Sequence, residues 1–464
     1  MLYESTRGGA QRLGFKEAVL EGLARDGGLL LPLEFPDVSS RLASWRRLDY
    51  PDLAREIFAI YTGGDLQGEA LESLLHRGFK AFRDPRVAPL RSFGRTHLLE
   101  LFHGPTWSFK DVALQTLGLL FELWPASHGE RTVLGATSGD TGSAAIHGLK
   151  GRKGNRVFIL FPEGRVSPVQ ELQMTTVPEA NVHCLALRGT FDDCQAVVKE
   201  LFADVALRDR LSLAAVNSIN WSRILSQIVY YFHGYFRFLE ASGKKIGAPL
   251  LCSVPTGNFG DIFAGYVAKK MGLPLEKLIV ATNENDILAR FAQSGAYTPR
   301  AVVPTSSPSM DIQVSSNFER LLFLLHGRNA TPVRQYMDDL KAQGRFTVDP
   351  ATLAEFRRDF AARRVSEEEC HEAIRHFDRD HGCVLDPHGA VGLHAGLAEA
   401  GGDDVMVLAT AHPGKFPAAV ERALGRKIEL PAEFKALEKL PRRKQVLPAD
   451  AAAVRAVLLE NAAG

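Results

Sequence analysis

The stretch RTVLGATSGDTGSAA (131–145) has the form of a buried strand, a loop of small residues and the start of a helix. Apolar runs of the same kind occur on both sides of it, at 96–102, 155–161, 181–187, 211–216, 249–254, 277–282 and 404–410. Helical patterns separate them, for example at 111–123 and 191–203. This alternation is typical of parallel sheets with helices on both faces. The sequence therefore predicts an α/β protein with two parallel sheets and ligands bound beyond the carboxyl ends of the strands.

The regions outside these runs are mostly helical in pattern. In the N-terminal part, 14–28 indicates a helix closed by Gly27 and Gly28, and 50–64 a helix that starts near Pro51. We expect a helical N-terminal region over 1–95.

Two α/β domains are expected to follow this region, one over 96–240 and one over 241–464. The second contains a charged, helical insertion at about 317–380, which includes the accessory bundle predicted for 330–380. The segment 294–316 is rich in Ser, Thr and Pro, and we expect it to be a mobile or substrate-covering loop.

The composition indicates a soluble globular protein, with 464 residues of which 45% are hydrophobic and 23% charged. A net charge of +1 creates no field that favours nucleic acid or an anionic membrane. The N-terminal residues lack the pattern of a secretory signal, and no apolar run approaches the length of a membrane span. Five cysteines without a CxxC pair fit reduced thiols and argue against a zinc site. We therefore expect a cytoplasmic protein that binds no nucleic acid, membrane or metal.

Lys110 lies in HGPTWSFKD (103–111), between a predicted strand and a predicted helix. Most lysines at such junctions are solvated and have no catalytic role. Here Trp107 and Phe109 stand beside it, and apolar surroundings lower the pKa of a lysine, as covalent catalysis by an amine requires. Lys110 is therefore the candidate catalytic residue.

The loop ATSGDTGSAA (136–145) opens a helix, where backbone N–H groups can bind a carboxylate. We assign such contacts to the backbone and to the hydroxyls of Thr137, Ser138 and Thr141. A capped helix after a tight glycine turn is the alternative. An ionised Asp140 would repel a substrate carboxylate, which leaves the role of this residue open.

The loop PTGNFGD (255–261) also lies between a strand and a helix. Gly257 and Gly260 allow the backbone to approach a ligand, and consecutive N–H groups can form a nest for a phosphate. No lysine follows the glycines, which disfavours nucleotide binding. Thr410, at the end of the run 404–410, could hydrogen-bond a ring nitrogen or be an ordinary strand-end threonine.

A fifth polar segment, VNSINWSR (216–223), follows a predicted strand. It contains Asn217, Ser218, Asn220 and Arg223, and the planar guanidinium can bind two phosphate oxygens at once. The alternative is a polar turn in which Asn220 or Ser222 caps a helix.

Together these segments resemble threonine synthases of the longer bacterial and fungal form, within the fold-type II pyridoxal-5′-phosphate (PLP) enzymes. The resemblance covers nearly the whole chain, through YESTRGG, HGPTWSFKD, ATSGDTGSA, VNSINWSR, PTGNFGD, ATNENDIL, SNFER, DPHGAVG and AHPGKF. One departure is Gly414, where the family usually has alanine.

The resemblance implies PLP-dependent elimination of phosphate from O-phospho-L-homoserine and addition of water to give L-threonine, by a monomer. It implies a cofactor site formed by Lys110 as the PLP-bearing lysine, Asp140 at the ring, Gly257, Asn258, Phe259, Gly260 and Asp261 around the phosphate, and Thr410 at the pyridine nitrogen. It implies a substrate site formed by Thr137, Ser138, Gly139 and Thr141 for the carboxylate, and Asn217, Ser218, Asn220 and Arg223 for the phosphate.

Two separate phosphate pockets would distinguish this chain from dehydratases of the same fold, whose substrates carry no phosphate. The nearest alternative is a threonine-synthase-like phospholyase that releases 2-oxobutyrate. A non-catalytic relative with a regulatory role is the alternative from another class, and an intact Lys110 argues against it.

Overall fold

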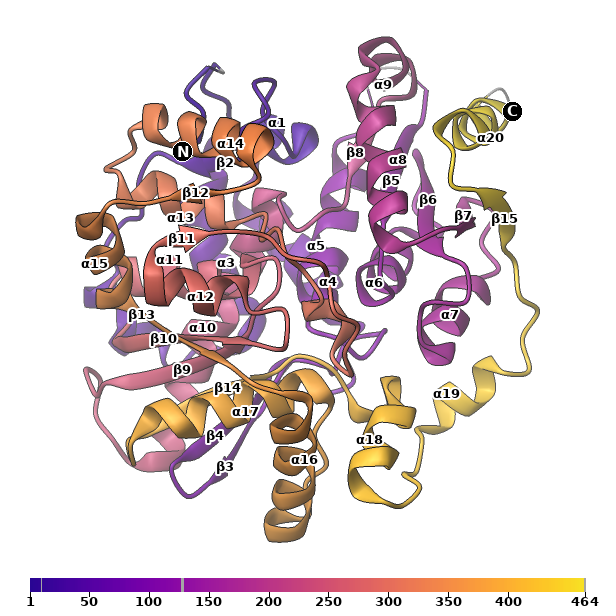
Figure 1. Ribbon diagram of the computed structural model, residues 1–464. Helices are drawn as coiled ribbons and strands as arrows, with labels where there is room; N and C mark the ends of the chain where they lie inside the picture. Colours follow the sequence, from indigo (N-terminus) through magenta and orange to yellow (C-terminus); the bar gives the residue numbers. More distant parts are fainter. Residues whose placement is uncertain (10, 127–128, 463–464) are drawn as a thin grey trace.

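The computed structural model describes residues 1–9, 11–126 and 129–462. Its larger sheet consists of β3 Leu90–Phe93, β4 Thr96–Glu100, β9 Leu250–Pro255, β10 Leu275–Thr282, β13 Phe360–Arg364 and β14 Val405–Ala409. The strand order is β13–β10–β9–β14–β4–β3, and only β3 runs antiparallel to its neighbour. This sheet occupies the left part of Figure 1.

The smaller sheet consists of β5 Arg131–Ala136, β6 Asn155–Pro162, β7 Val182–Arg188, β8 Ala214–Ala215 and β15 Gln445–Pro448. Its order is β15–β7–β6–β5–β8, with every pair parallel, and it occupies the right part of Figure 1. The prediction of an α/β fold with two parallel sheets is confirmed. Two short antiparallel pairs complete the strands, β1 Tyr3–Ser5 with β2 Leu30–Pro32 and β11 Ala296–Tyr297 with β12 Phe346–Thr347.

Each apolar run predicted as a strand contains one, but the run at 211–216 is mostly not extended. Leu211 ends helix α9 (Val205–Leu211), and Ser212 then takes a left-handed conformation with φ 47°. Only Ala214 and Ala215 remain to pair with β5.

The helices that cover the sheets are α5 Lys110–Leu123, α6 Asp140–Leu149, α7 Pro168–Thr175, α8 Phe191–Ala203, α10 Trp221–Ser242, α11 Gly260–Lys270, α12 Ile287–Ser294 and α17 Pro387–Ala400. Of these, α5, α6, α10 and α11 each follow a strand and one of the predicted loops. The long α10 packs against both α5 and α11 and is buried along most of its length. The starts of α5, α6 and α11 therefore converge between the two sheets (Figure 1).

The N-terminal region contains α1 Phe15–Glu21, α2 Leu42–Trp45, α3 Tyr50–Thr62 and α4 Gly68–Phe79. The helix predicted for 50–64 is confirmed, with Pro51 in its first turn and an Asp49 side chain that accepts from the N–H of Asp52. The predicted end of the first helix at Gly27 and Gly28 is wrong. That helix ends at Gly22, whose φ of 66° suits a residue without Cβ.

The predicted insertion is not purely helical. It contains α13 Phe318–Leu325, α14 Ala330–Gln343, α15 Pro350–Asp359 and α16 Glu367–His381. Between α14 and α15, however, β12 pairs with β11, and between α15 and α16, β13 joins the edge of the larger sheet beside β10. The charged composition of FAARR hides this strand, because an edge strand leaves part of its side chains in solvent.

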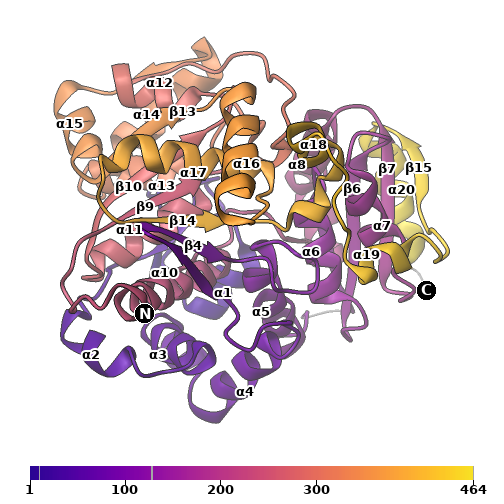
Figure 2. The same cartoon turned by 90° about the horizontal axis from the view of Figure 1, so that it is seen from below.

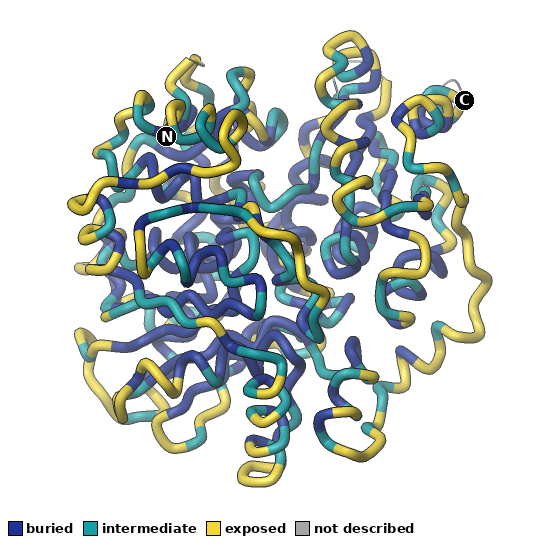
Figure 3. Tube along the Cα trace, in the orientation of Figure 1, coloured by how far each residue is buried: buried dark blue, intermediate teal, exposed yellow. Residues whose placement is uncertain are grey.

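After β14 the chain leaves the larger sheet and runs along the outside of the molecule to the smaller one. This crossing segment, 411–448, contains α18 Pro417–Leu424 and α19 Ala432–Leu437 and ends in β15, which precedes α20 Ala451–Ala462. Figures 1 and 2 show it in yellow tones, and Figure 3 shows that much of its outer part is exposed.

Sheet membership does not follow sequence order. β4 lies within the range 96–240 but belongs to the larger sheet, and β15 lies within 241–464 but belongs to the smaller one. The domain boundaries given above stay a prediction. None of the helices in the described part of the chain has both the length and the apolar character that a membrane span requires.

Candidate active site

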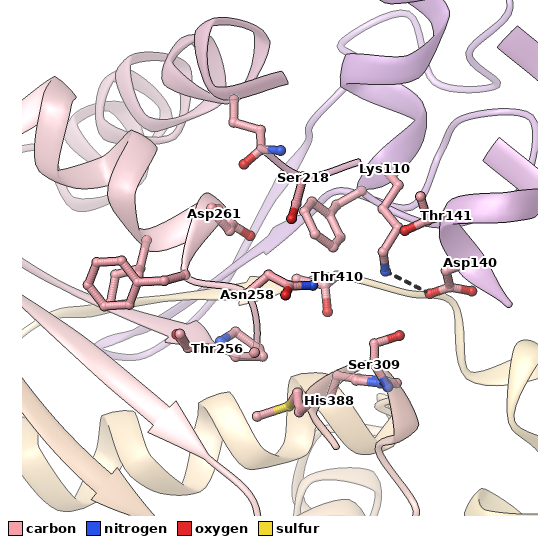
Figure 4. A pocket seen from close by; sticks show the side chains of 18 of the residues that line it. Lys110, Asp140, Thr141, Ser218, Thr256, Asn258, Asp261, Ser309, His388 and Thr410 are labelled. Carbon is pink, nitrogen blue, oxygen red and sulfur yellow. Dashed lines mark hydrogen bonds and ion pairs between the residues drawn. The ribbon is translucent and has the colours of Figure 1, made fainter. Parts of the chain in front are cut away.

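A pocket lies at the carboxyl ends of β4, β9 and β14, between the two sheets (Figure 4). Its lining comes from seven parts of the chain, namely Phe109–Lys110, Asp140–Thr141, Ser218 with Arg223 and Gln227, Pro255–Ile262, Ser309–Met310, His388 and Thr410. The position agrees with the rule that open parallel sheets bind ligands beyond their strand ends.

Lys110 is the first residue of α5, and its side chain extends into this pocket. Its Nζ lies 3.2 Å from Oδ2 of Asp140 and 4.7 Å from the centre of the Phe109 ring. Burial lowers the pKa of Lys110, and this effect outweighs the attraction of Asp140, which acts in the opposite direction. The predicted apolar setting is thus present, although Trp107 is not part of it. Trp107 instead lies under the Arg83 guanidinium, 3.9 Å away.

Asp140 has a role that sequence reasoning left open. Its two oxygens bind two buried lysines, Lys110 and Lys415, with Lys415 Nζ 2.8 Å from Oδ1. Burial raises the pKa of Asp140, but Lys415 and Lys110 outweigh burial and hold it well below its usual range. Asp140 is therefore an ionised partner of lysines.

The loop before α11 forms an amide-rich wall of the pocket. The N–H groups of Gly257, Phe259 and Gly260 have no acceptor among the described residues, and all three residues line the pocket. Gly257 has no room for a side chain, because a Cβ there would come 2.8 Å from the carbonyl oxygen of Ser309. Phe259 takes a left-handed conformation with φ 62° at the start of α11. These are the features of a backbone nest that binds an anion.

Asp261, the last residue of the predicted loop, cannot donate a hydrogen bond to an anion through its side chain when that side chain is ionised. Its Oδ1 accepts hydrogen bonds from the hydroxyls of Tyr230 and Tyr231, at 2.5 and 2.9 Å, and Oδ2 is buried without a partner among the described residues. Burial raises the pKa of Asp261 to about 6, although both tyrosines lower it. Its backbone is the part suited to an anion.

Arg223 supplies a buried positive charge to the same pocket. It is 2% exposed, its Nη1 donates to the carbonyl of Val216 at 3.0 Å, and no described residue accepts from its Nε. Burial lowers the pKa of Arg223 to about 10, which still leaves the guanidinium charged at neutral pH. The structure places Arg223, Ser218 and the amide wall in the lining of one cavity, and two separate phosphate-binding pockets stay a prediction.

Five predicted substrate residues are not among those that line the pocket: Thr137, Ser138, Gly139, Asn217 and Asn220. The Thr137 hydroxyl accepts from the N–H groups of Gly139 and Gly142 and thereby holds the loop. Gly139 has φ 135°, and a Cβ there would meet the Gln170 side chain at 2.3 Å. Asn220 caps α10 by accepting from the N–H of Ser222, which is the alternative that the sequence left open.

Thr141 and Thr410 do line the pocket, as predicted. The N–H groups of Asp140 and Thr141, at the start of α6, have no acceptor within the described part of the chain. Thr410 directly follows β14, and its carbonyl accepts from the N–H of Phe109 at 2.8 Å, which joins the end of β14 to the start of α5.

Sequence reasoning missed three polar residues of the pocket. His388 donates from Nδ1 to Asp386 at 2.6 Å, and its Nε2 accepts from the N–H of Ser309 at 3.1 Å. Gln227 lies one turn beyond Arg223 on α10, and its Oε1 is buried without a described partner. The sequence offered a signal for two of them: His388 lies in the motif DPHGAVG, and Ser309 lies in the predicted covering loop. It offered no signal for Gln227.

Three family models match the chain. One described as "Pyridoxal-phosphate dependent enzyme" matches 96–411, "Threonine synthase N terminus" matches 2–79, and "Threonine synthase, C-terminal" matches 389–458. A threonine synthase from Schizosaccharomyces pombe is 47% identical over 91% of this chain and 89% of its own length. The crystal structure of PLP-bound threonine synthase from Brucella melitensis is 47% identical, with a TM-score of 0.94 over 100% of both chains. The chain belongs to the threonine synthase family.

The fold-type resemblance inferred from the sequence is thereby confirmed. A protein called threonine synthase-like 2 from Homo sapiens is more distant, at 36% identity over 94% of this chain and 92% of its own length. As a member of the threonine synthase family, the chain is a PLP-dependent enzyme.

The pocket fits the cofactor of the threonine synthase family. Unpaired N–H groups at the start of α11 suit a phosphate, because it accepts hydrogen bonds without needing a cation. The buried Lys110 amine, with its lowered pKa, suits covalent attachment to an aldehyde. The hydroxyl of Thr410 lies on the same wall as Lys110 (Figure 4) and can serve a ring nitrogen.

Proposed function

We propose that this chain converts O-phospho-L-homoserine and water into L-threonine and phosphate, with Lys110 as the residue that carries PLP. The observation that supports this most directly is Arg223, a buried guanidinium in the same pocket as Lys110 and the amide nest, whose Nε has no hydrogen-bond partner among the described residues. A pocket with both a nest and a buried cation can hold two anionic groups at once.

The cofactor would be held by Lys110, by the backbone of Gly257–Asp261 and by the hydroxyl of Thr410. When bound, PLP supplies an electron sink for the bonds at the substrate α-carbon. The free N–H groups of Asp140 and Thr141 would bind the substrate carboxylate at the start of α6.

Lys110, once its amine is free, would accept the proton from Cα, release it, and then accept the proton from Cβ of the substrate. After phosphate has left, one of these protons would return to the substrate at Cγ and the other at Cα. Arg223, with the nearby Ser218 hydroxyl, would hold the phosphate group and stabilise its charge as it leaves Cγ. Phosphate retained by Arg223 would accept a proton from the water that adds at Cβ.

Product analysis with O-phospho-L-homoserine tests this proposal. We expect equal amounts of threonine and inorganic phosphate, without 2-oxobutyrate above background. Release of 2-oxobutyrate with phosphate would instead identify a threonine-synthase-like phospholyase. Failure to form any product, in protein with PLP bound, would indicate a non-catalytic relative.

We also infer that the enzyme acts as a monomer in the cytoplasm. The monomer is what the family resemblance implies, and the five cysteines are buried and unpaired, which suits a reducing compartment. Light scattering on the purified protein tests the monomer, and fractionation of the producing cells tests the location.

A further inference from the structure

Two lysines share one carboxylate at the base of the pocket. Asp140 accepts from Lys110 through Oδ2 at 3.2 Å, and through Oδ1 from Lys415 at 2.8 Å and from Gln170 at 2.9 Å. Lys415 is 0% exposed, and its Nζ also donates to the carbonyl of Thr106 at 2.7 Å.

Lys415 reaches this position from the crossing segment, and it binds Oδ1 of Asp140 while Lys110 binds Oδ2. Its own carbonyl accepts from the hydroxyl of Ser167 at 3.0 Å, and Ser167 caps α7, the helix that carries Gln170. Three separate segments therefore fix the Lys415 ammonium and its distance to Asp140.

The charges of Lys110, Asp140 and Lys415 decide whether the Lys110 amine keeps its proton in the pocket. A buried carboxylate with a single ammonium partner holds the proton on that partner, because either group alone would be a desolvated charge. With Lys415 present, Asp140 is already neutralised when the Lys110 amine has no charge. The Lys415–Asp140 pair therefore lets Lys110 lose its proton inside the pocket.

We propose that Lys415 is a positioning residue that neutralises Asp140 and so keeps the Lys110 amine uncharged and able to react. This inference rests on the proposed role of Lys110, and it makes the reactivity of Lys110 depend on a residue that does not line the pocket. Without the Lys415 ammonium, Asp140 would pair with Lys110 alone and hold it as an ammonium ion without a lone pair.

Other charged or titratable groups face this cluster from the elements around it. They are Arg223 from α10, Asp261 from α11, Asp111 from α5, His147 from α6 and His388 from α17. Arg223 and Lys415 both lower the pKa of Lys110, beside the larger effect of burial. In the part of the chain that the structure describes, Asp140 forms ion pairs with Lys110 and Lys415 and with none of these other groups.

The test is competitive labelling of the full-length protein after removal of PLP, with trace acetic anhydride between pH 6 and 10. An uncharged amine forms the new N–C bond, acetate leaves and the amine proton passes to water, so labelling reports the unprotonated fraction. Peptide mass spectrometry measures Lys110, with the exposed Lys199 as internal standard.

Lys415→Met should reduce labelling of Lys110 at pH 7.5 about tenfold and move the midpoint of the curve of labelling against pH to higher pH. The reason is that a carboxylate with no other cation partner raises the pKa of a neighbouring amine by about 1–3. Asp140→Asn should move the midpoint to lower pH. The double variant, which removes both charges, should return it close to the parent value.

Shifts of opposite sign cannot come from a general loosening of the pocket, which would move both variants in one direction. An unchanged midpoint in Lys415→Met, or a double variant that stays as unreactive as Lys415→Met, would overturn the proposal. If Lys415→Met does not fold, an unchanged midpoint in Asp140→Asn overturns it as well. Because labelling needs no substrate, these results are independent of whether threonine is formed.

Discussion

At the scale of single residues, Lys110 stands out because it is both buried and reachable from the pocket. Its amine lies beside Asp140 and over the Phe109 ring, and burial lowers its pKa. Lys150 and Lys415, which are close in sequence to two of the pocket loops, do not extend into the pocket. Lys150 lies at the far end of α6, and Lys415 points at Asp140 from outside the pocket lining.

Reduction of the PLP-loaded protein with borohydride should attach the cofactor permanently to Lys110. The physical reason is that the uncharged amine is the form that bonds to an aldehyde, and burial lowers the pKa of Lys110 and so favours this form. Peptide mapping by mass spectrometry measures the modified position, and Lys110→Ala is the control that should carry no label. A label on Lys150 or Lys415 would contradict the assignment.

Arg223 is the second residue whose environment predicts a function. We expect Arg223→Ala to lower kcat/KM for O-phospho-L-homoserine by about 2–4 kcal/mol of transition-state binding, because a charge-assisted contact in a desolvated pocket is lost. PLP should remain bound, as judged by its absorbance. Arg210→Ala, an exposed arginine on α9, is the matched control and should behave as the parent. If kcat/KM is unchanged in Arg223→Ala, the segment 216–223 is only a turn.

At the scale of elements, the decisive feature is the start of α11. The helix begins at Gly260 after a left-handed Phe259, so the preceding N–H groups point into the pocket instead of into a helix. Gly257 permits this path, because Ser309 and Ile312 pack against it from the 294–316 segment. The predicted covering loop thus forms part of the wall.

Gly257→Ala should therefore weaken PLP binding at least about tenfold, with a loss of stability of about 1–3 kcal/mol from overpacking. A Cβ would lie 2.8 Å from the Ser309 carbonyl oxygen, so either the loop or the Ser309 segment must shift. Titration with PLP and denaturant unfolding measure the two effects. Gly64→Ala is the control, since nothing lies within 4 Å of a Cβ there. Equal PLP affinity in both variants would show that the nest does not hold the phosphate.

At the scale of the whole molecule, the two sheets are connected by the chain passing between them more than once. After β14 the crossing segment returns to the smaller sheet, where β15 pairs with β7 and α20 packs on the core beside α8. Lys415, near the start of this segment, forms an ion pair with Asp140, so the segment contacts both a pocket residue and the smaller sheet.

Leu458→Ala should lower the free energy of unfolding by about 2–5 kcal/mol, because it leaves a cavity under α20. Leu458 is 1% exposed and belongs to the core of the smaller sheet. Leu440, on the crossing segment and 45% exposed, provides the control, with an expected change for Leu440→Ala within about 0.5 kcal/mol. Denaturant unfolding measures both. Similar losses in the two variants would mean that α20 contributes little to the fold.

The sequence by itself determined the apolar runs that contain β4, β5, β6, β7, β9, β10 and β14, the loops that follow several of them, and Lys110 as the candidate lysine. These features depend on apolar periodicity and on glycine or hydroxyl residues that are neighbours along the chain. Their signal is local, and tertiary packing preserved it in these strands. In the run at 211–216 it left only the short β8, because the residues before it form α9.

Only the tertiary structure decided which side chains share the pocket. Asp140 and Lys415 are far apart in sequence, as are Lys110 and His388, and their meeting depends on how the two sheets and the crossing segment pack. The edge strand β13 was missed for the same reason, since its pairing with β10 compensates for a charged composition. The side chains of Asn220 and Thr137 accept hydrogen bonds from nearby backbone N–H groups and do not line the pocket. The residue type shows that a side chain can form a hydrogen bond, but the geometry of the fold determines its partner.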